Sequence, residues 1–432
     1  MVKIVALVLF LLTYVLLLSL PKIRAWIALT TACIFILLTF IPDFSVLMPI
    51  TQVFGAIDWN VLMMIAGTMI VVDLFIDSKM PSVLANVIIK KTPNVKWAVI
   101  AMAVFAGVIS AFIDNVATVL IVAPIAISIS KKLEISPVPS VIAIAVFSNL
   151  EGAATLVGDT TSIMLGGYAD WNFLDFFWLE GRPGPFFIIQ VGLVAATVVL
   201  ALILRKLTQP IELNEEVKAE SYVPTILLCG IIVTLIIVSF IPSGSKPAVA
   251  NGIVTMTYAI IGLIYVTIKN KSFKNAGEIL KNFDYFTLVL LASLFVIIAG
   301  ITNVGVIEDI ADLIVKIGGT NPFVVYTIIV FFSMLVSAFI DNIPYVLTML
   351  PVMGSLAAGT GAPLTLLLLG LIIGATLGGN LTPIGASANI AGIGILRKEG
   401  HEVKLKEYLR IGVPVTLAAV VAGYIVTWFL FS

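Results

Sequence analysis

The sequence predicts an all-α polytopic membrane protein, in which two inverted-topology repeats each contribute five spanning helices, a re-entrant hairpin and a broken helix. The first observation behind this fold class is composition, since 60% of the 432 residues are hydrophobic and 11% are charged, whereas a soluble domain carries about a quarter charged residues. The second is a series of apolar segments, such as residues 186–204 and 249–268, that are long enough to cross a hydrocarbon core of about 30 Å as helices. The third is an internal repeat.

The internal repeat centres on a motif with adjacent aspartate and asparagine residues. Residues 109–125 read ISAFIDNVATVLIVAPI and residues 336–352 read VSAFIDNIPYVLTMLPV, with nine of seventeen positions identical at a separation of 227 residues. The same separation relates two glycines and a threonine in each half, namely Gly152, Thr155 and Gly158, and Gly379, Thr382 and Gly385. A constant separation over so long a stretch indicates an internal duplication.

Each half follows the same order of elements. We expect three apolar spans, a short amphipathic helix, the Asp-Asn segment, a Gly/Thr-rich broken span and a closing helix. The predicted ranges are 3–20, 25–41, 58–76, 78–91, 97–131, 138–166 and 185–206 in the first half, and 222–241, 248–268, 284–301, 305–317, 323–357, 364–396 and 411–430 in the second. Asp58 and Asp284 precede spans and are expected to be N-caps. Residues 2–20 are interpreted as a spanning helix, because no small-residue cleavage site of a signal peptide follows them.

The distribution of basic residues predicts the orientation of the two repeats, residues 1–208 and 222–432. Five crossings in each repeat would invert the second repeat relative to the first. This topology places 20 of the 24 lysine and arginine residues on one side of the membrane, which the positive-inside rule makes cytoplasmic. We therefore expect both termini outside a plasma (inner) membrane and a cytoplasmic linker at residues 209–221, whose acidic residues are Glu212, Glu215, Glu216 and Glu220.

The Asp-Asn segments either cross the membrane twice or re-enter it, and both paths return to the same side. Around Asp114 and Asn115 the flanking residues are apolar, with no cluster of Gly, Asn, Ser or Lys that a surface turn would need. The same holds around Asp341 and Asn342. The pattern favours two hairpins with buried polar tips.

Polar residues at membrane depth are costly and default to a functional interpretation. They gather at the hairpin tips and in the two broken spans, where Gly and Pro interrupt the helices and would free backbone groups for ions or solutes. The candidate ion- or solute-binding residues are Asp114, Asn115, Thr118, Asn149, Thr155, Gly158, Asp159, Thr160, Asp341, Asn342, Thr376, Asn380, Thr382, Gly385, Ser387 and Asn389. A Na⁺ ion is expected between the two Asp-Asn pairs and the backbone carbonyls near Gly152 and Gly379.

The charge of this predicted site favours coupling to a cation. Asp114, Glu151, Asp159 and Asp341 are expected near it, with no lysine or arginine at comparable depth. Buried carboxyl groups must be protonated, hydrogen-bonded or paired with a cation. The site therefore suits H⁺ or Na⁺ together with a neutral or monovalent solute, and it disfavours an uncompensated multivalent anion.

The Asp-Asn tips and the Gly/Thr breaks, together with GGNLTPIGASANIAGIGILRKEG in the second half, resemble the ion-transporter superfamily, closest to ArsB-type arsenite permeases, NhaD-type Na⁺/H⁺ antiporters and the pink-eyed dilution protein. This resemblance spans essentially the whole chain. It implies a homodimer with elevator-type alternating access, a scaffold domain from residues 1–91 and 222–317, and a transport domain from residues 97–206 and 323–432. Sodium–dicarboxylate symporters of the superfamily carry Ser-Asn-Thr at both tips, which this sequence lacks.

Three transport functions are open on this basis. The first is cation-coupled movement of a small inorganic solute or anion, with arsenite as the candidate from the resemblance. The second is Na⁺/H⁺ antiport, and the third is Na⁺-coupled symport of citrate or another dicarboxylate. A channel is the rival from another class, which the paired hairpins disfavour.

The remaining features exclude other classes of protein. No nucleophile–base pair or metal constellation is present, so we do not expect an enzyme. No cofactor is expected apart from a coupling Na⁺ or H⁺. The partners should be the lipid bilayer and a small ion or solute, with no nucleic acid. No GxxxxGK[ST] motif occurs, so intrinsic ATP drive is not expected, and a separate ATPase subunit is left open.

Overall fold

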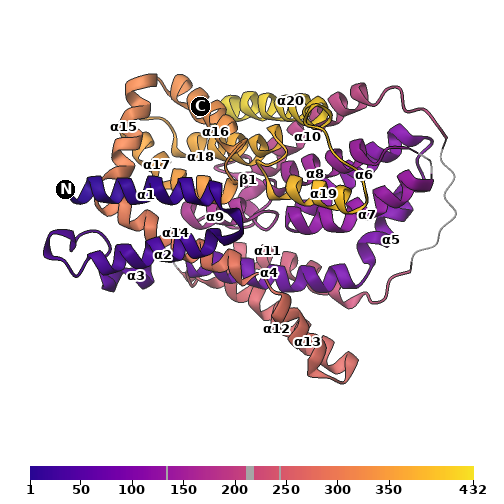
Figure 1. Cartoon of the computed structure of the whole chain (residues 1–432), viewed down its shortest axis with the longest axis horizontal. Helices are drawn as coiled ribbons and strands as arrows, with labels where there is room; N and C mark the ends of the chain where they lie inside the picture. The colour runs from indigo at the N-terminus through magenta and orange to yellow at the C-terminus, as the bar shows by residue number, and fades with distance from the viewer. Residues whose placement is uncertain (133–134, 211–217, 243–244) are drawn as a thin grey trace.

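The computed structural model describes residues 1–132, 135–210, 218–242 and 245–432. The glutamates at positions 212, 215 and 216 of the predicted linker lie outside the described residues. The described part is helical apart from connections and one short antiparallel strand pair, β1 (Trp178–Leu179) and β2 (Arg182–Pro183). Figure 1 shows helices of both halves packed side by side along the long axis of the molecule.

The helices of the first half follow the predicted order. They are α1 (Val2–Ser19), α2 (Arg24–Leu38), α3 (Ile50–Ala56), α4 (Trp59–Asp77), α5 (Met80–Ile89), α6 (Val95–Ser110), α7 (Asn115–Lys132), α8 (Val138–Gly152), α9 (Thr160–Ala169) and α10 (Pro185–Ile203). The hairpin is α6–α7, and the broken span is α8–α9 with its interruption between Gly152 and Thr160. Asp58 caps α4 by accepting a hydrogen bond from the Val61 amide at 3.0 Å, which confirms its predicted role.

The second half repeats this order. Its elements are α11 (Val223–Ser239), α12 (Ala250–Asn270), α13 (Phe273–Asn282), α14 (Tyr285–Asn303), α15 (Val306–Gly318), α16 (Pro322–Ser337), α17 (Asn342–Thr360), α18 (Leu364–Ile372), the π-helix η5 (Ile373–Leu377), the 3₁₀ helix η6 (Gly379–Leu381), α19 (Ser387–Lys398) and α20 (Leu405–Phe431). Asp284 caps α14 through the Thr287 amide at 3.1 Å, again as predicted. The second break is therefore a π turn, a 3₁₀ turn and a non-helical turn over residues 382–386 in series.

Residues separated by 227 positions make the same contacts in the two halves. A Cβ added to Gly158 would lie 2.7 Å from the Gly152 carbonyl oxygen and 2.8 Å from that of Ala111. The corresponding atoms in the second half are the carbonyl oxygens of residues 379 and 338, at 2.6 and 2.7 Å from a Cβ on residue 385. The same backbone shape is thus built twice, which is consistent with two repeats related by an inversion of topology.

The helices are long and apolar enough for a membrane protein. Within the described ranges, nine helices could cross a membrane by length and composition, or ten if α15 and α16, bent by 114° at their junction, are counted as one span. Large apolar side chains such as Ile4, Leu11, Ile260 and Ile264 are exposed on α1 and α12. These surfaces suit contact with lipid, because the hydrocarbon core is an apolar solvent.

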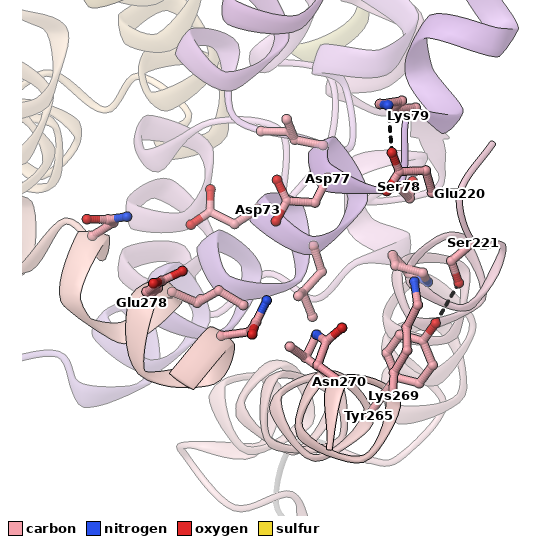
Figure 2. A pocket seen from close by; sticks show the side chains of 17 residues that line it. Asp73, Asp77, Ser78, Lys79, Glu220, Ser221, Tyr265, Lys269, Asn270 and Glu278 are labelled. Carbon is pink, nitrogen blue, oxygen red and sulfur yellow. Dashed lines mark hydrogen bonds and ion pairs between the residues drawn. The ribbon is translucent and has the colours of Figure 1, made fainter. Parts of the chain in front are cut away.

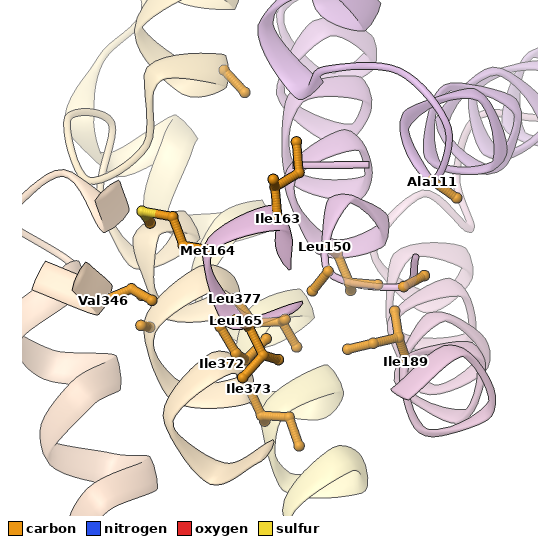
Figure 3. Close-up of a cluster of buried hydrophobic side chains, with 14 of the residues drawn as sticks. Ala111, Leu150, Ile163, Met164, Leu165, Ile189, Val346, Ile372, Ile373 and Leu377 are labelled. Atoms are coloured by element: carbon orange, nitrogen blue, oxygen red, sulfur yellow. The ribbon is translucent and has the colours of Figure 1, made fainter. Parts of the chain in front are cut away.

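The two broken spans pack together in the interior. Leu150 of α8, Ile163 and Leu165 of α9, and Ile373 and Leu377 of η5 are all nearly inaccessible. Figure 3 shows these side chains gathered between ribbons of both halves. Apolar packing around the interruptions holds the non-helical backbone in place, so the breaks are buried in protein, where such backbone is tolerated.

Surface ion pairs lie outside the spans. Lys131 at the end of α7 contacts Glu399 after α19 at 2.6 Å, and both side chains are exposed. The hydrogen bond and charge of Lys131 hold the pKa of Glu399 below its ordinary value. Exposed pairs contribute little to stability, so this contact orients the two helix ends without dominating the fold.

Candidate functional site

The tip of hairpin 1 (α6–α7) is fixed to the first break by backbone and hydroxyl contacts. Asp114 precedes α7, and its Oδ1 accepts hydrogen bonds from the amides of Val116 at 3.0 Å and Ala117 at 3.1 Å. The Thr155 hydroxyl donates to the Ala111 carbonyl oxygen. Thr155, predicted as an ion ligand, therefore holds the hairpin against the break.

Hairpin 2 (α16–α17) is held in the same way. The Oδ1 atom of Asp341 accepts from the Ile343 amide at 3.2 Å, and the Thr382 hydroxyl donates to the Ala338 carbonyl oxygen. The side chain of Asn342 accepts from the Ser337 hydroxyl and donates to the Thr376 carbonyl oxygen at 3.4 Å. Asn342 is 5% exposed, which confirms the predicted buried tip.

A buried amide network joins the two halves between the hairpins. Asn115 donates to Asn149 Oδ1 at 2.9 Å, and Asn149 donates across the halves to the Thr376 carbonyl oxygen at 2.6 Å. In the other direction, Asn380 donates to the Val146 carbonyl oxygen at 3.0 Å. The predicted residues Asn115, Asn149, Thr376 and Asn380 are thus brought together as one continuous polar centre, although most of their polar atoms bind one another.

A small acid-lined cavity lies beside this centre, at the tip of hairpin 1. It is lined by Asp114, by Asp159 and Thr160 at the start of α9, and by α4 through Thr68 and its apolar neighbours. The cavity volume is about 20 Å³, which is room for about one water molecule or small ion. Among the described residues that line it there is no lysine or arginine. It therefore presents two carboxyl groups, with hydroxyl groups, to one small guest.

Asp159 is positioned by its place at the start of a helix. It is 6% exposed, and its Oδ2 accepts a hydrogen bond from the Thr161 hydroxyl at 2.8 Å. The Thr161 hydroxyl also lies 3.1 Å from that of Thr376 in the other half. The cavity is therefore connected through two hydroxyl groups to the amide network.

The prediction that no basic side chain lies at the depth of the acids was wrong. Arg24, at the start of α2, places its Nη1 atom 2.6 Å from Asp341 Oδ2, and each side chain is less than a quarter exposed. The sequence suggested a cytoplasmic loop for Arg24, because it follows Pro-Lys-Ile at the end of an apolar run. Figure 1 instead shows α1 ending near the middle of the molecule, so that α2 begins beside hairpin 2.

Some of the other predicted site residues have hydrogen-bond partners, and others carry a buried polar atom without one. Ser387 donates to Asp341 Oδ2 at 3.0 Å, while the carbonyl oxygens near the breaks accept from neighbours, that of Gly152 from Ser162 and that of Gly379 from Asn389, each at 3.2 Å. Thr118 Oγ1 and Asn389 Oδ1 are buried and have no hydrogen-bond partner among the described residues. Buried polar atoms are normally paired, so these two atoms, on α7 and α19, are exceptions, and neither residue lines the cavities at the hairpin tips.

Glu151 was predicted to lie near the site, but its side chain forms a hydrogen bond with α10 and does not line the acid-lined cavity. Glu151 is 0% exposed, and its Oε2 accepts from Gln190 of α10 at 2.6 Å, while Oε1 has no partner among the described residues. It packs beside Gly107. The corresponding positions of the second half carry Gly378, Met334 and Leu417, an apolar arrangement, so the fold does not require this polar pair.

This difference between the halves predicts a stability result. Gln190→Leu should lower the free energy of unfolding by about 1–3 kcal/mol, because it leaves a buried carboxyl group without a partner. Glu151→Met combined with Gln190→Leu should recover most of that loss, since it replaces the polar pair with methionine and leucine, which are the large apolar residues at the corresponding positions of the second half. Thermal unfolding of the purified variants measures both effects, and a double variant no more stable than Gln190→Leu would contradict the interpretation.

A large open pocket lies further along α4. Its volume is about 790 Å³, and Figure 2 shows Asp73 and Asp77 of α4 and Glu278 of α13 lining it. Lys79 pairs with Glu220 at its rim at 2.6 Å and holds the pKa of Glu220 below its ordinary value. Helix α4 borders both cavities, because Thr68 lines the acid-lined cavity and Asp73, on the next turn, lines this pocket.

Paired hairpins, paired broken helices and a polar centre enclosed by both halves define a secondary transporter. The chain belongs to the citrate transporter family, whose model matches residues 14–366. It is therefore a membrane transporter and not an enzyme, and the resemblance to the ion-transporter superfamily is confirmed.

Relatives support the same class. The uncharacterized transporter Rv2684 of Mycobacterium tuberculosis is 30% identical, over 99% of this chain and 98% of that protein. The P protein of Homo sapiens is 25% identical, over 87% of this chain and 54% of that protein. Among solved structures, the YdaH transporter of Alcanivorax borkumensis matches with a TM-score of 0.60 at 14% identity, covering 87% of this chain and 86% of that one. This last likeness shows the fold.

Proposed function

We propose that the protein is a cation-coupled transporter whose coupling ion, H⁺ or Na⁺, binds in the acid-lined cavity at the tip of hairpin 1. The observation that carries the proposal is the pairing of Asp114 and Asp159 in a cavity with room for about one small ion and no lysine or arginine among its described lining residues. Like charges so close together must be neutralised by a proton or a cation. Binding of the ion and movement of a solute are then linked through the amide network that joins the cavity to the second half.

The first candidate solute is a small inorganic species, with arsenite preferred. Arsenous acid is largely neutral at pH 7 and meets no repulsion from the carboxyl groups.

Two other candidates have an observation in their favour. Na⁺/H⁺ antiport is favoured by the carboxyl pair itself, which could bind the exchanged ions in turn. Carboxylate symport is favoured by the citrate transporter family to which the chain belongs. In that case the cations must accompany the anion, because an acid-lined site repels an uncompensated one.

We extend the proposal to an elevator mechanism in a homodimer at the plasma membrane. The scaffold would comprise residues 1–91 and 222–317, where α4 packs against α12 and α2 against α14. The moving domain would comprise residues 97–206 and 323–432, where α6 packs on α8 and α10 on α20. The acid-lined cavity lies between these groups of helices, since α4 faces α7 and α9 across it.

A proteoliposome experiment separates the candidates. The purified protein is reconstituted with an imposed pH gradient, and the collapse of that gradient is followed on addition of Na⁺, Li⁺, arsenite or citrate. A response to arsenite supports the first candidate, a response to Na⁺ or Li⁺ alone supports antiport, and a response that needs citrate supports carboxylate symport. If uptake of radiolabelled arsenite or citrate proceeds with no dependence on either cation, and Na⁺ alone dissipates no gradient, the proposal fails.

A further inference from the structure

The two hairpin tips have the same shape but differ in formal charge. At hairpin 1, Asp114 shares its cavity with Asp159. The position that corresponds to Asp159 in the second half is Ala386, so hairpin 2 contributes the single carboxyl group of Asp341. Hairpin 2 is also the one that meets Arg24. Counted by formal charge, the first half-site holds two negative groups and the second holds one negative and one positive group.

No equivalent of Arg24 reaches hairpin 1. In the second half, the helix that corresponds to α2 is α12, which begins with Ala250 and Asn251, and neither is basic. The described lining of the hairpin 1 cavity contains no lysine or arginine. The two halves therefore differ in two ways. Hairpin 1 has a second carboxyl group nearby, and hairpin 2 has an arginine in contact with its single carboxyl group.

Arg24 occupies the carboxylate oxygen of Asp341 that a bound cation would need. The guanidinium approaches Asp341 Oδ2 to 2.6 Å, and the same oxygen accepts from Ser387 at 3.0 Å. The neighbouring cavity, with a volume of about 30 Å³, is otherwise lined by Tyr14 and apolar residues, and Arg24 is the one basic residue among its described lining. A small cation at Asp341 would compete for the oxygen that Arg24 now contacts.

The pair lies where two groups of helices meet. Arg24 belongs to α2, and the Tyr14 hydroxyl of α1 donates to the Pro344 carbonyl oxygen of hairpin 2 at 2.6 Å. A link between helices could be made by apolar packing, and taking a guanidinium and a carboxylate out of water is costly. The charge of the arginine therefore needs an explanation beyond tethering the hairpin.

We propose that Arg24 is a fixed counter-ion that takes the place of a mobile cation at hairpin 2. In this conformation the protein then binds one coupling cation, at Asp114 and Asp159, and none at Asp341. This inference rests on the proposed function of the hairpin 1 cavity, and it adds the number and the location of the coupling ions.

Equilibrium cation binding to the purified full-length protein tests the count. Binding of ²²Na⁺ is measured by scintillation proximity at fixed pH, and proton uptake is measured by titration in Na⁺-free buffer. At a cation concentration that just saturates the wild-type site, the wild-type protein should bind one cation per chain, and Asp114→Asn should bind almost none because its affinity is about 100-fold lower. Arg24→Gln, which frees Asp341, should bind two, whereas Arg24→Lys and the double variant Arg24→Gln with Asp341→Asn should each bind one.

The variant Asp341→Asn keeps the test decisive even if Arg24→Gln does not fold. It should still bind one cation, with weaker affinity because an unpaired guanidinium now repels the ion. Two cations bound by the wild-type protein would overturn the assignment of Arg24 while leaving the hairpin 1 site intact. Loss of the single bound cation in Asp341→Asn would place that ion at hairpin 2 and overturn both assignments. A wild-type protein whose cation binding does not depend on Asp114 would instead overturn the proposed function as well.

Discussion

Asp114→Asn is expected to uncouple transport and to reduce the affinity for the coupling cation by about 100-fold. The substitution keeps the shape of the tip, because the amide oxygen can still accept from the Val116 and Ala117 amides as Asp114 Oδ1 does. It removes the charge that faces the cavity. Loss of one partner of a buried charge pair costs about 2–5 kcal/mol, and about 1.4 kcal/mol is a tenfold change in affinity. Cation-dependent solute uptake into proteoliposomes measures the effect.

Two matched variants make this result specific. Asp159→Asn should behave like Asp114→Asn, because both carboxyl groups line the same cavity. Asp43→Asn should leave uptake unchanged, since Asp43 is exposed in the short helix η2 (Pro42–Phe44) and lines neither cavity at the hairpin tips. Wild-type cation dependence in both Asp114→Asn and Asp159→Asn would remove the cavity from the transport cycle.

Gly158→Ala is expected to cause a large loss of stability, because the break leaves no room for a methyl group. The new Cβ would lie 2.7 Å from one carbonyl oxygen and 2.8 Å from two others, those of Gly152, Ala111 and Ser110. Backbone oxygens in a packed break cannot move as a flexible side chain can. We expect a decrease of about 3 kcal/mol in the free energy of unfolding, or failure of the protein to accumulate in the membrane.

The repeat supplies a second instance, and the chain supplies a control. Gly385→Ala should have a similar effect, because its Cβ would lie 2.6–2.7 Å from three carbonyl oxygens. Gly359→Ala, near the end of α17, should be neutral or slightly stabilising, since nothing lies within 4 Å of its Cβ and alanine favours a helix. Thermal unfolding in detergent compares the three, and equal stability of Gly158→Ala and Gly359→Ala would contradict the close packing at the break.

The order of the helices and the position of the polar centre were predictable, because the same motifs occur in both halves of the sequence. The repeated Asp-Asn motif located both hairpins, and the repeated Gly and Thr residues located both breaks. Burial of Asn115 and Asn342 followed from the apolar flanks of the motif. What repetition could not give was the contact made by each polar group. The hydroxyl groups of Thr155 and Thr382 tie each hairpin to its break, and their role as ligands stays a prediction.

The charge balance of the site could not be predicted, because it depends on contacts between distant segments. Arg24 and Asp341 are separated by 317 positions, and in the sequence Arg24 looks like part of a basic loop. Its position follows from where α1 ends within the molecule, which hydropathy does not specify. The sequence did show one sign that the two halves differ in charge. Asp159 in the first half corresponds to Ala386 in the second.

The central claim is that a mobile cation binds between Asp114 and Asp159 and drives transport. Charge displacement recorded from proteoliposomes on a solid-supported membrane measures this step directly, after a rapid jump in Na⁺ concentration or in pH. The account predicts a transient current for one of these ions in the wild-type protein and in Asp43→Asn, and no transient in the double variant Asp114→Asn with Asp159→Asn. A current of wild-type size in that double variant would contradict it.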